Sequence, residues 1–286
     1  MTALGPVLRL LETQGAALGH FNVADLVLLK AVLGAADEIR VPVFIGASEG
    51  ERDFFGTHQL AALLNDMRND SHIPVFLNAD HTHSLAKAIE AAKAGFDSVG
   101  VDFSALPMEQ NVSRTKEAVE AIKAINPNIL AEAEIGDIGT GSEIHEIERH
   151  DPASLTTPEE ARQFVHATGI DVLAPAVGNS HGMAKSMVQG TTKKHLDVDR
   201  IAQIKKASGV FLTLHGGSAT EDEDLRTAIA AGINIIHINT MEALAGRQSL
   251  QRPRSSSAVS DPAAGRGCGQ GGGRFAPEIV HGATDR

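Results

Sequence analysis

Eight short runs rich in β-branched and apolar residues recur along the chain, and segments of helical periodicity separate them. The runs cover residues 17–23, 41–48, 73–81, 98–104, 128–136, 171–178, 209–217 and 233–240. Strands that alternate with helices form a parallel sheet through right-handed crossovers, and eight such units close a (β/α)8 barrel. The pattern therefore predicts an α/β fold of the TIM-barrel class. An open doubly wound sheet is the alternative, but eight near-equal units leave no obvious switch point.

Helical periodicity and a change of composition predict how the chain is organised. The clearest helical segments are residues 26–39, 83–95, 110–125, 158–169 and 222–232, and several of them end at a glycine. We predict one barrel domain over residues 1–245. Residues 246–286 are rich in Gly, Arg, Ser and Pro and lack periodic apolar content, which predicts a disordered tail. The eighth helix of the barrel is accordingly predicted to be short or missing.

Charge and cysteine usage narrow the range of partners. The net charge of -11 gives no long-range attraction for nucleic acid or an acidic membrane, although local N–H groups can still bind a small phosphate. The only cysteine is Cys268, which favours a reducing cytoplasm. No run approaches the ~18 apolar residues of a membrane span. We predict a cytoplasmic protein whose partner is a small molecule.

Three histidines stand where predicted strands end. His81, His181 and His215 lie at or near the ends of the third, sixth and seventh strands. In barrels of this class the chemistry lies at the C-terminal ends of the strands, and a catalytic zinc ion takes three protein ligands. A hydrogen-bonded structural histidine is the alternative for any one of them. Three at equivalent positions favour a metal site.

The segment "DHTH" allows two ligand assignments. His81 and His83 could both bind a metal, as in metal-dependent hydrolases, if the segment were extended. Helical periodicity from about residue 83 favours His81 as the ligand and His83 as a surface residue at the start of a helix. Asp80 lies beside the ligand and can act as a general acid or base.

These residues stand in motifs that resemble the class II, zinc-dependent fructose-bisphosphate and tagatose-bisphosphate aldolases. The resemblance covers residues 17–240 and rests on "LNADHTHSLAKAIEAAKAGFDSVGVDFS", "AEAEIGDIG", "DVLAPAVGNSHG", "LTLHGGS" and "INTMEA", in this order. It implies a lyase that reversibly cleaves a ketose 1,6-bisphosphate, fructose 1,6-bisphosphate first, to dihydroxyacetone phosphate and glyceraldehyde 3-phosphate. It does not separate fructose from tagatose bisphosphate. It also implies a homo-oligomer, dimer or larger.

The resemblance implies a role for each site residue. Asp80 would be the acid/base that acts on the C4 hydroxyl, and His81, His181 and His215 would bind zinc. Some members hold a second cation, divalent or monovalent, for which Asp102 and Glu134 would be ligands here. A buried, hydrogen-bonded carboxylate is the alternative for both.

A phosphate site is implied in the same way. The residues expected to bind substrate or its phosphates are Ser48, Gly182, Gly216, Gly217, Ser218, His237, Asn239 and Thr240. Glycines allow close backbone approach, so that N–H groups of the last loops can receive a phosphate. A plain glycine turn is the alternative for "HGG". His237 stands where many relatives carry asparagine.

The second acid/base and the C-terminus depart from the family pattern. The family takes its second acid/base from the loop after the fifth strand. Glu143 is the choice here, with Glu146 behind it and a solvated acidic loop as the alternative. No predicted strand ends in a lysine, which disfavours a Schiff-base aldolase. Nothing after Arg247 matches the family pattern. The alternative function is therefore a catalytically impaired paralogue or a damaged product that at most binds sugar phosphate. A metallohydrolase using His81 and His83 is a third possibility.

Overall fold

Parallel strands form a closed barrel at the centre of the computed structural model, which describes residues 3–139, 144–145, 155–189 and 191–239. The barrel order is β1-β10-β9-β7-β5-β4-β3-β2. The bounds are β1 Leu18–Asn22, β2 Val43–Ala47, β3 Val75–Thr82, β4 Ser98–Val101, β5 Leu130–Ile135, β7 Val172–Pro175, β9 Phe211–Leu214 and β10 Ile233–Ile238. Each strand lies within one of the eight predicted runs or overlaps it by all but one residue. The TIM-barrel prediction is confirmed, and the closed order excludes the open sheet.

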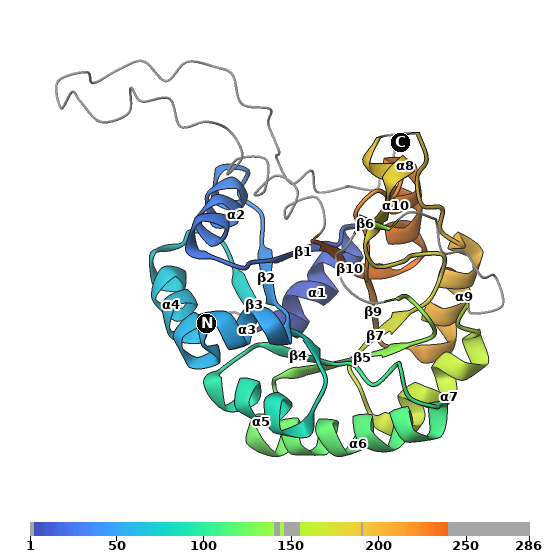
Figure 1. Ribbon diagram of the computed structural model, residues 1–286, viewed down its shortest axis with the longest axis horizontal. Coiled ribbons are helices and arrows are strands. Elements are labelled where there is room, and N and C mark those ends of the chain that lie inside the picture. The colour runs from blue at the N-terminus through green and yellow to red at the C-terminus, as the bar shows by residue number, and fades with distance from the viewer. Residues whose placement is uncertain (1–2, 140–143, 146–154, 190, 240–286) are drawn as a thin grey trace.

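Helices surround the strands as an outer ring (Figure 1). They are α2 Leu26–Glu38, α3 Glu49–Phe55, α4 Thr57–Asp70, α5 Leu85–Ala94, α6 Met108–Ile125, α7 Pro158–Thr168, α9 Val198–Ser208 and α10 Asp222–Ala231. The core between strands and helices is almost entirely aliphatic, as a chain with few aromatic residues requires. The five predicted helical segments are all helical, and their ends carry the expected signals. For example, Thr157 and Glu160 form a capping box at the start of α7, and Gly169 ends the helix in the left-handed conformation.

Helix α1, Leu4–Thr13, closes the N-terminal end of the barrel. Its apolar face packs against interior side chains at the beginnings of the strands, among them Leu18, Phe44 and Phe76. This end of the barrel is therefore filled with apolar side chains. The opposite end, where the strands finish, carries the buried polar side chains.

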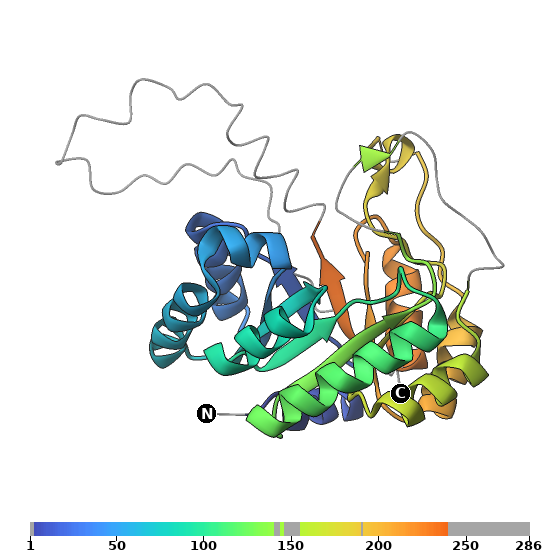
Figure 2. The same cartoon turned by 60° about the horizontal axis from the view of Figure 1, so that its bottom comes forward.

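Short elements stand beyond the C-terminal ends of the strands. β6, Ile144–His145, pairs in parallel with β8, Met183–Ala184, and joins the segments that follow β5 and β7. The four-residue helix α8, Lys185–Val188, continues from β8, and both stand above the barrel in Figure 2. The predicted short eighth helix and the tail 246–286 lie outside the described residues. Within the described ranges, none of the helices has the length and apolar character needed to cross a membrane.

Candidate metal centre and active site

Asp80 and His81 occupy a bulge at the end of β3. Ala79 pairs with Val99 and Thr82 with Val101, so β3 uses one residue more than β4 over this interval. His81 has a φ of 41°, a conformation that residues other than glycine rarely adopt. Regular alternation would send adjacent side chains to opposite faces of the strand, and a bulge redirects one of them. Asp80 and His81 can therefore both reach the barrel mouth.

Arg52 of α3 holds this bulge in place. Its side chain is buried, with 1% of the residue exposed. It donates to the Asp80 carbonyl at 2.9 Å, to Thr82 Oγ1 at 2.8 Å and to the Ala47 carbonyl at the end of β2. Arg52 is not among the residues that the sequence predicts for the site. The capping box of Ser48 and Glu51 predicts the helix, but no sequence signal shows that Arg52 turns inward.

The three predicted zinc ligands converge at the barrel mouth. The centroid of the His81 ring lies 4.7 Å from that of His181 and 4.8 Å from that of His215, and the last two are 5.4 Å apart. Glu134 of β5 joins them: one ligand atom from each of the four residues lies within 4.8 Å of the others. These side chains come from β3, the loop after β7, the end of β9 and β5. The set predicted from widely separated motifs is brought together.

Each of the three imidazoles uses one nitrogen to contact a hydrogen-bond acceptor outside this set. Nδ1 of His81 lies 2.9 Å from Asp102 Oδ2, Nδ1 of His181 lies 2.8 Å from the Gly139 carbonyl, and Nε2 of His215 lies 2.8 Å from Glu132 Oε1. Metal-binding histidines characteristically donate their second N–H in this way, which fixes the tautomer and the ring orientation. The other nitrogen of each ring is left for a metal.

Asp102 takes the hydrogen-bonded position that the sequence analysis gave as the alternative to a second-cation ligand. It is the hydrogen-bond acceptor of His81, and it belongs to neither of the two clusters of described side chains that could hold a metal ion. Glu132 serves His215 in the same way. Because Glu132 and Glu134 are two apart on β5, both point into the barrel, and each contacts His215 through a different ring nitrogen.

The surrounding carboxylates favour positive charge in the cluster. Burial lowers the pKa of His81, but the charge of Asp80 and the hydrogen bond to Asp102 outweigh it and raise that pKa to about 9. The pKa of His215 is likewise raised well above its usual value: burial opposes the shift, and Glu132 and Glu134 cause it. Nδ1 of His215 and Oε2 of Glu134 are buried 3.1 Å apart without a well-formed hydrogen bond. A cation between these atoms would satisfy both, so the residues fit a metal ion.

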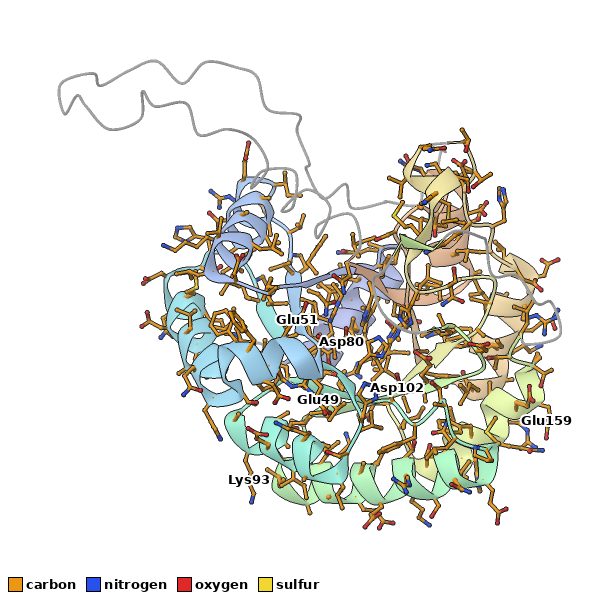
Figure 3. The ribbon with its side chains drawn as sticks, viewed as in Figure 1. Glu49, Glu51, Asp80, Lys93, Asp102 and Glu159 are labelled. Carbon is orange, nitrogen blue, oxygen red and sulfur yellow. The ribbon has the colours of Figure 1, made fainter. Side chains whose placement is uncertain are left out.

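Asp80 lies beside the cluster with one free oxygen. Asn22 donates to its Oδ2 at 3.0 Å, whereas Oδ1 is buried and has no hydrogen-bond partner. Oδ1 lies 3.6 Å from His237 Nδ1 and 3.9 Å from His81 Nε2. Burial raises the pKa of Asp80, but the nearby histidines outweigh it and hold the pKa well below its usual range. The side chain is therefore an ionised carboxylate with an oxygen available to accept a proton. Figure 3 shows Asp80 and Asp102 at the centre of the ring, and Lys93 and Glu159 at its outside.

His237 is buried in the barrel, deeper than expected for a residue that binds a phosphate at the surface. Its ring stacks on His20 at 3.5 Å and on His215 at 4.2 Å between centroids. Burial lowers the pKa of His20 to about 4, so this ring is neutral near pH 7. His237, Asp80, Glu132 and His215 form the second cluster that could hold a metal. His237 thus belongs to the wall around Asp80.

The glycines of the predicted phosphate site are required by the backbone. Gly182 and Gly216 have φ of 70° and 62°, and a Cβ on Gly216 would lie 2.1 Å from the Ser180 carbonyl oxygen. The N–H of Gly217 donates to the His237 carbonyl at 3.0 Å and is used within the fold, while the place of Gly217 in the phosphate site stays a prediction. Ser218 remains suitable, since its Oγ is buried without a partner.

The remaining predicted residues divide into three groups. Ser48 caps α3 at the end of β2, and Asn239 is half-buried after β10. His83 is exposed as predicted, but it does not begin the helix: β3 runs to Thr82, and α5 starts at Leu85 with Ser84 as its cap. Glu143, Glu146 and Thr240 lie outside the described residues.

The fold and the cluster define a TIM-barrel protein with a metal-binding type of site at the C-terminal ends of its strands. Residues 3–265 match the family model "Fructose-bisphosphate aldolase class-II". The chain is 36% identical over 226 residues to a fructose-bisphosphate aldolase of Thermus caldophilus. The aligned region covers 79% of this chain and 72% of the relative. The chain is 34% identical over 243 residues to one of Staphylococcus aureus, covering 84% and 81%. The chain belongs to the class II fructose-bisphosphate aldolase family.

Solved structures agree with this assignment. A putative fructose-1,6-bisphosphate aldolase from Coccidioides immitis superposes with a TM-score of 0.75 at 30% identity, over 89% of this chain and 86% of that one. The YdjI aldolase from Escherichia coli K12 gives a TM-score of 0.73 at 29% identity, over 89% of each chain.

Proposed function

We propose that this protein is a zinc-dependent aldolase that reversibly cleaves fructose 1,6-bisphosphate to dihydroxyacetone phosphate and glyceraldehyde 3-phosphate. One observation carries the proposal: three imidazoles with their outer nitrogens hydrogen-bonded converge beside a buried carboxylate, Asp80, that has one free oxygen.

His81, His181 and His215 would hold the zinc ion, with Glu134 as a further ligand in reach. Three protein ligands leave a coordination position for substrate, as catalytic zinc sites do. When bound, zinc supplies a Lewis acid that polarises the carbonyl of the substrate. Asp102, the Gly139 carbonyl and Glu132 orient the three rings. Asp102 would act through His81 and not as the ligand of a second cation.

Asp80 would accept the proton of the C4 hydroxyl as the bond between C3 and C4 breaks. Its low pKa keeps it ionised at neutral pH. Asn22 holds Oδ2, so Oδ1, which has no hydrogen-bond partner, would be the oxygen that accepts the proton. Glu51 in turn accepts a hydrogen bond from Asn22 at 3.2 Å, which fixes the amide. A positioned acid/base of this kind contributes ~10²–10⁴-fold to the rate.

The loops after β7 and β9 would bind a substrate phosphate through Gly182, Gly216 and Ser218, with Asn239 and Thr240 after β10. Glu143 is proposed as the second acid/base, which returns a proton to the carbon freed by cleavage.

A cytoplasmic location is proposed on the basis of the single cysteine. A homo-oligomer, dimer or larger, is proposed on the basis of the family resemblance. Light scattering on the purified protein tests the oligomeric state.

A metal-exchange assay tests the proposed reaction. Cleavage of fructose 1,6-bisphosphate is followed before chelation, after EDTA and dialysis, and after zinc is added back, with tagatose 1,6-bisphosphate as the comparison substrate. The proposal expects activity to vanish with the metal and to return with zinc. Zinc-loaded protein that cleaves neither substrate would instead support the impaired product, and full activity in metal-free protein would exclude metal-dependent chemistry.

A further inference from the structure

Lys194 is a buried lysine close to the candidate metal centre. It lies between α8 and α9, and only 1% of the residue is exposed. Its Nζ donates to three backbone carbonyls: Ser180 at 2.6 Å, Gly182 at 2.9 Å and Gly216 at 2.8 Å. Its backbone N–H also donates to the Ala219 carbonyl at 2.9 Å. The whole residue is thus built into the loops that follow β7 and β9.

The three carbonyls identify the charged form of the side chain as the one that fits. An ammonium group has three N–H donors, and each finds one carbonyl oxygen here. Burial lowers the pKa of Lys194 to about 8, so the group still carries its proton at pH 7. A protonated amine has no free electron pair. Lys194 is therefore suited to act as a cation and not as a Schiff-base nucleophile.

The position of the carbonyls connects this cation to the site. Ser180 and Gly182 stand on either side of His181, and Gly216 directly follows His215. The two loops touch through their backbones, because a Cβ on Gly216 would lie 2.1 Å from Ser180 O. Carbonyl oxygens that point to one place repel one another unless a positive charge lies between them. Hydrogen bonds from a charged donor are also stronger than those from a neutral one.

We propose that Lys194 is a positioning residue whose ammonium group acts as an internal cation and locks the loops after β7 and β9 together. These hydrogen bonds fix the position of His181 relative to His215. They also fix the backbone of Gly182 and Gly216, which would face a substrate phosphate. The metal and phosphate parts of this proposal rest on the proposed function. The role predicted for Lys194 is indirect, because its Nζ contacts only main-chain oxygens among the described residues.

Lys205 provides a matched control. It also makes three hydrogen-bonded contacts, to the Val210 carbonyl at 3.0 Å, to Asn234 Oδ1 at 2.9 Å and to Glu12 Oε1 at 2.7 Å. These partners lie at the N-terminal ends of the strands, away from the candidate centre. Loss of Lys205 should therefore lower stability without changing metal or phosphate binding.

The experiment compares Lys194→Met with Lys205→Met at pH 7. Zinc affinity is measured by competition with a chromophoric chelator, and KM and kcat for fructose 1,6-bisphosphate are measured on zinc-saturated protein. We expect Lys194→Met to weaken zinc binding ~10–100-fold, the range seen when residues that support metal ligands are lost, and to raise KM more than it lowers kcat. Lys205→Met should bind zinc as the unaltered protein does. Equal zinc affinity and equal KM in the two variants would overturn the proposal.

Two further variants keep the test decisive if Lys194→Met does not fold. Lys194→Gln keeps N–H donors without the charge and should still bind zinc more weakly than the unaltered protein; unchanged affinity and KM contradict the role of the charge. In Lys194→Ala, ammonium chloride should recover part of the zinc affinity, and sodium chloride at the same ionic strength should not. Equal effects of the two salts would contradict an internal cation.

Zinc affinity does not depend on turnover. If the unaltered protein binds zinc but cleaves no substrate, the proposed function fails while the zinc comparison still tests Lys194.

Discussion

Nδ1 of His81 donates a hydrogen bond to Oδ2 of Asp102 at 2.9 Å, while the other oxygen of the same carboxylate is held by Ser104. This relationship fixes which nitrogen of His81 can bind a metal. Asp102 comes from the end of β4, the strand next to the bulge that carries His81. Two neighbouring strands thus supply a ligand and the acceptor that orients it.

Replacing Asp102 by asparagine should reverse the tautomer of His81. The backbone N–H and the hydroxyl of Ser104 both donate to Oδ1, so the amide oxygen would keep that position and the NH2 group would face Nδ1. Nδ1 would then have to accept, which leaves the proton on Nε2 and removes that nitrogen as a ligand. We expect Asp102→Asn to weaken zinc binding ~10–100-fold in a chelator competition.

Ser104→Ala is the control for this prediction. It removes the hydroxyl but keeps the backbone N–H, so the carboxylate still faces His81 and zinc affinity should change little. If Asp102→Asn binds zinc as tightly as Ser104→Ala does, Asp102 does not orient His81.

Arg52→Met should damage both stability and turnover. The substitution leaves the carbonyls of Ala47 and Asp80 and the Thr82 hydroxyl without their donor inside the barrel, at ~1–3 kcal/mol for each unsatisfied group. The bulge that aims Asp80 and His81 also loses its support. Urea unfolding and kcat are the measurements.

Arg68→Met separates stability from positioning. Arg68 forms an ion pair with Asp97, and Asp97 also accepts from the backbone of Leu77, so this contact lies well before the bulge in β3. Arg68→Met should lower the free energy of unfolding and leave kcat within about twofold. An unchanged kcat in Arg52→Met would mean that the bulge keeps its shape without the arginine.

His81→Ala and His83→Ala test the ligand assignment directly. The first should lose bound zinc on dialysis, and the second should keep it, because His83 is exposed and its Nδ1 lies 3.2 Å from the Asp102 carbonyl instead of in the cluster. Metal analysis of the dialysed proteins decides between them. Loss of zinc in His83→Ala would revive the His-x-His pair of a metallohydrolase.

The barrel and the convergence of the three histidines could be predicted because periodicity and strand ends report them directly. Eight apolar runs alternate with helical segments, and three histidines lie at or near the ends of three of those runs. In a parallel barrel all strand ends meet at one rim, so residues that are 100 positions apart become neighbours. The convergence of His81, His181 and His215 needed only this topology; their role as zinc ligands stays a prediction.

The bulge and the buried cations could not be predicted in the same way. Helical periodicity in the sequence predicts that the helix after β3 begins near His83. In the structure β3 stays extended to Thr82 because of the extra residue in its bulge, and the sequence carries no signal for that residue. Arg52 and Lys194 look like surface charges in the sequence, since charged side chains are rarely fully buried. Their inward direction depends on main-chain oxygens that only the folded barrel brings together. The division into a domain of residues 1–245 and a tail of residues 246–286 stays a prediction.

In the proposed site the metal ligands and the proton acceptor are separate residues, and Asp80→Asn distinguishes the two roles. Asparagine keeps the size of the side chain and its place beside Asn22 but cannot take the C4 hydroxyl proton. Zinc content and the rate of fructose 1,6-bisphosphate cleavage should be measured on the same preparation. Asp80→Asn should bind as much zinc as the unaltered protein, and its kcat should fall ~10²–10⁴-fold. If the zinc is lost together with the activity, or if kcat stays near normal, Asp80 is not a proton acceptor separate from the metal ligands.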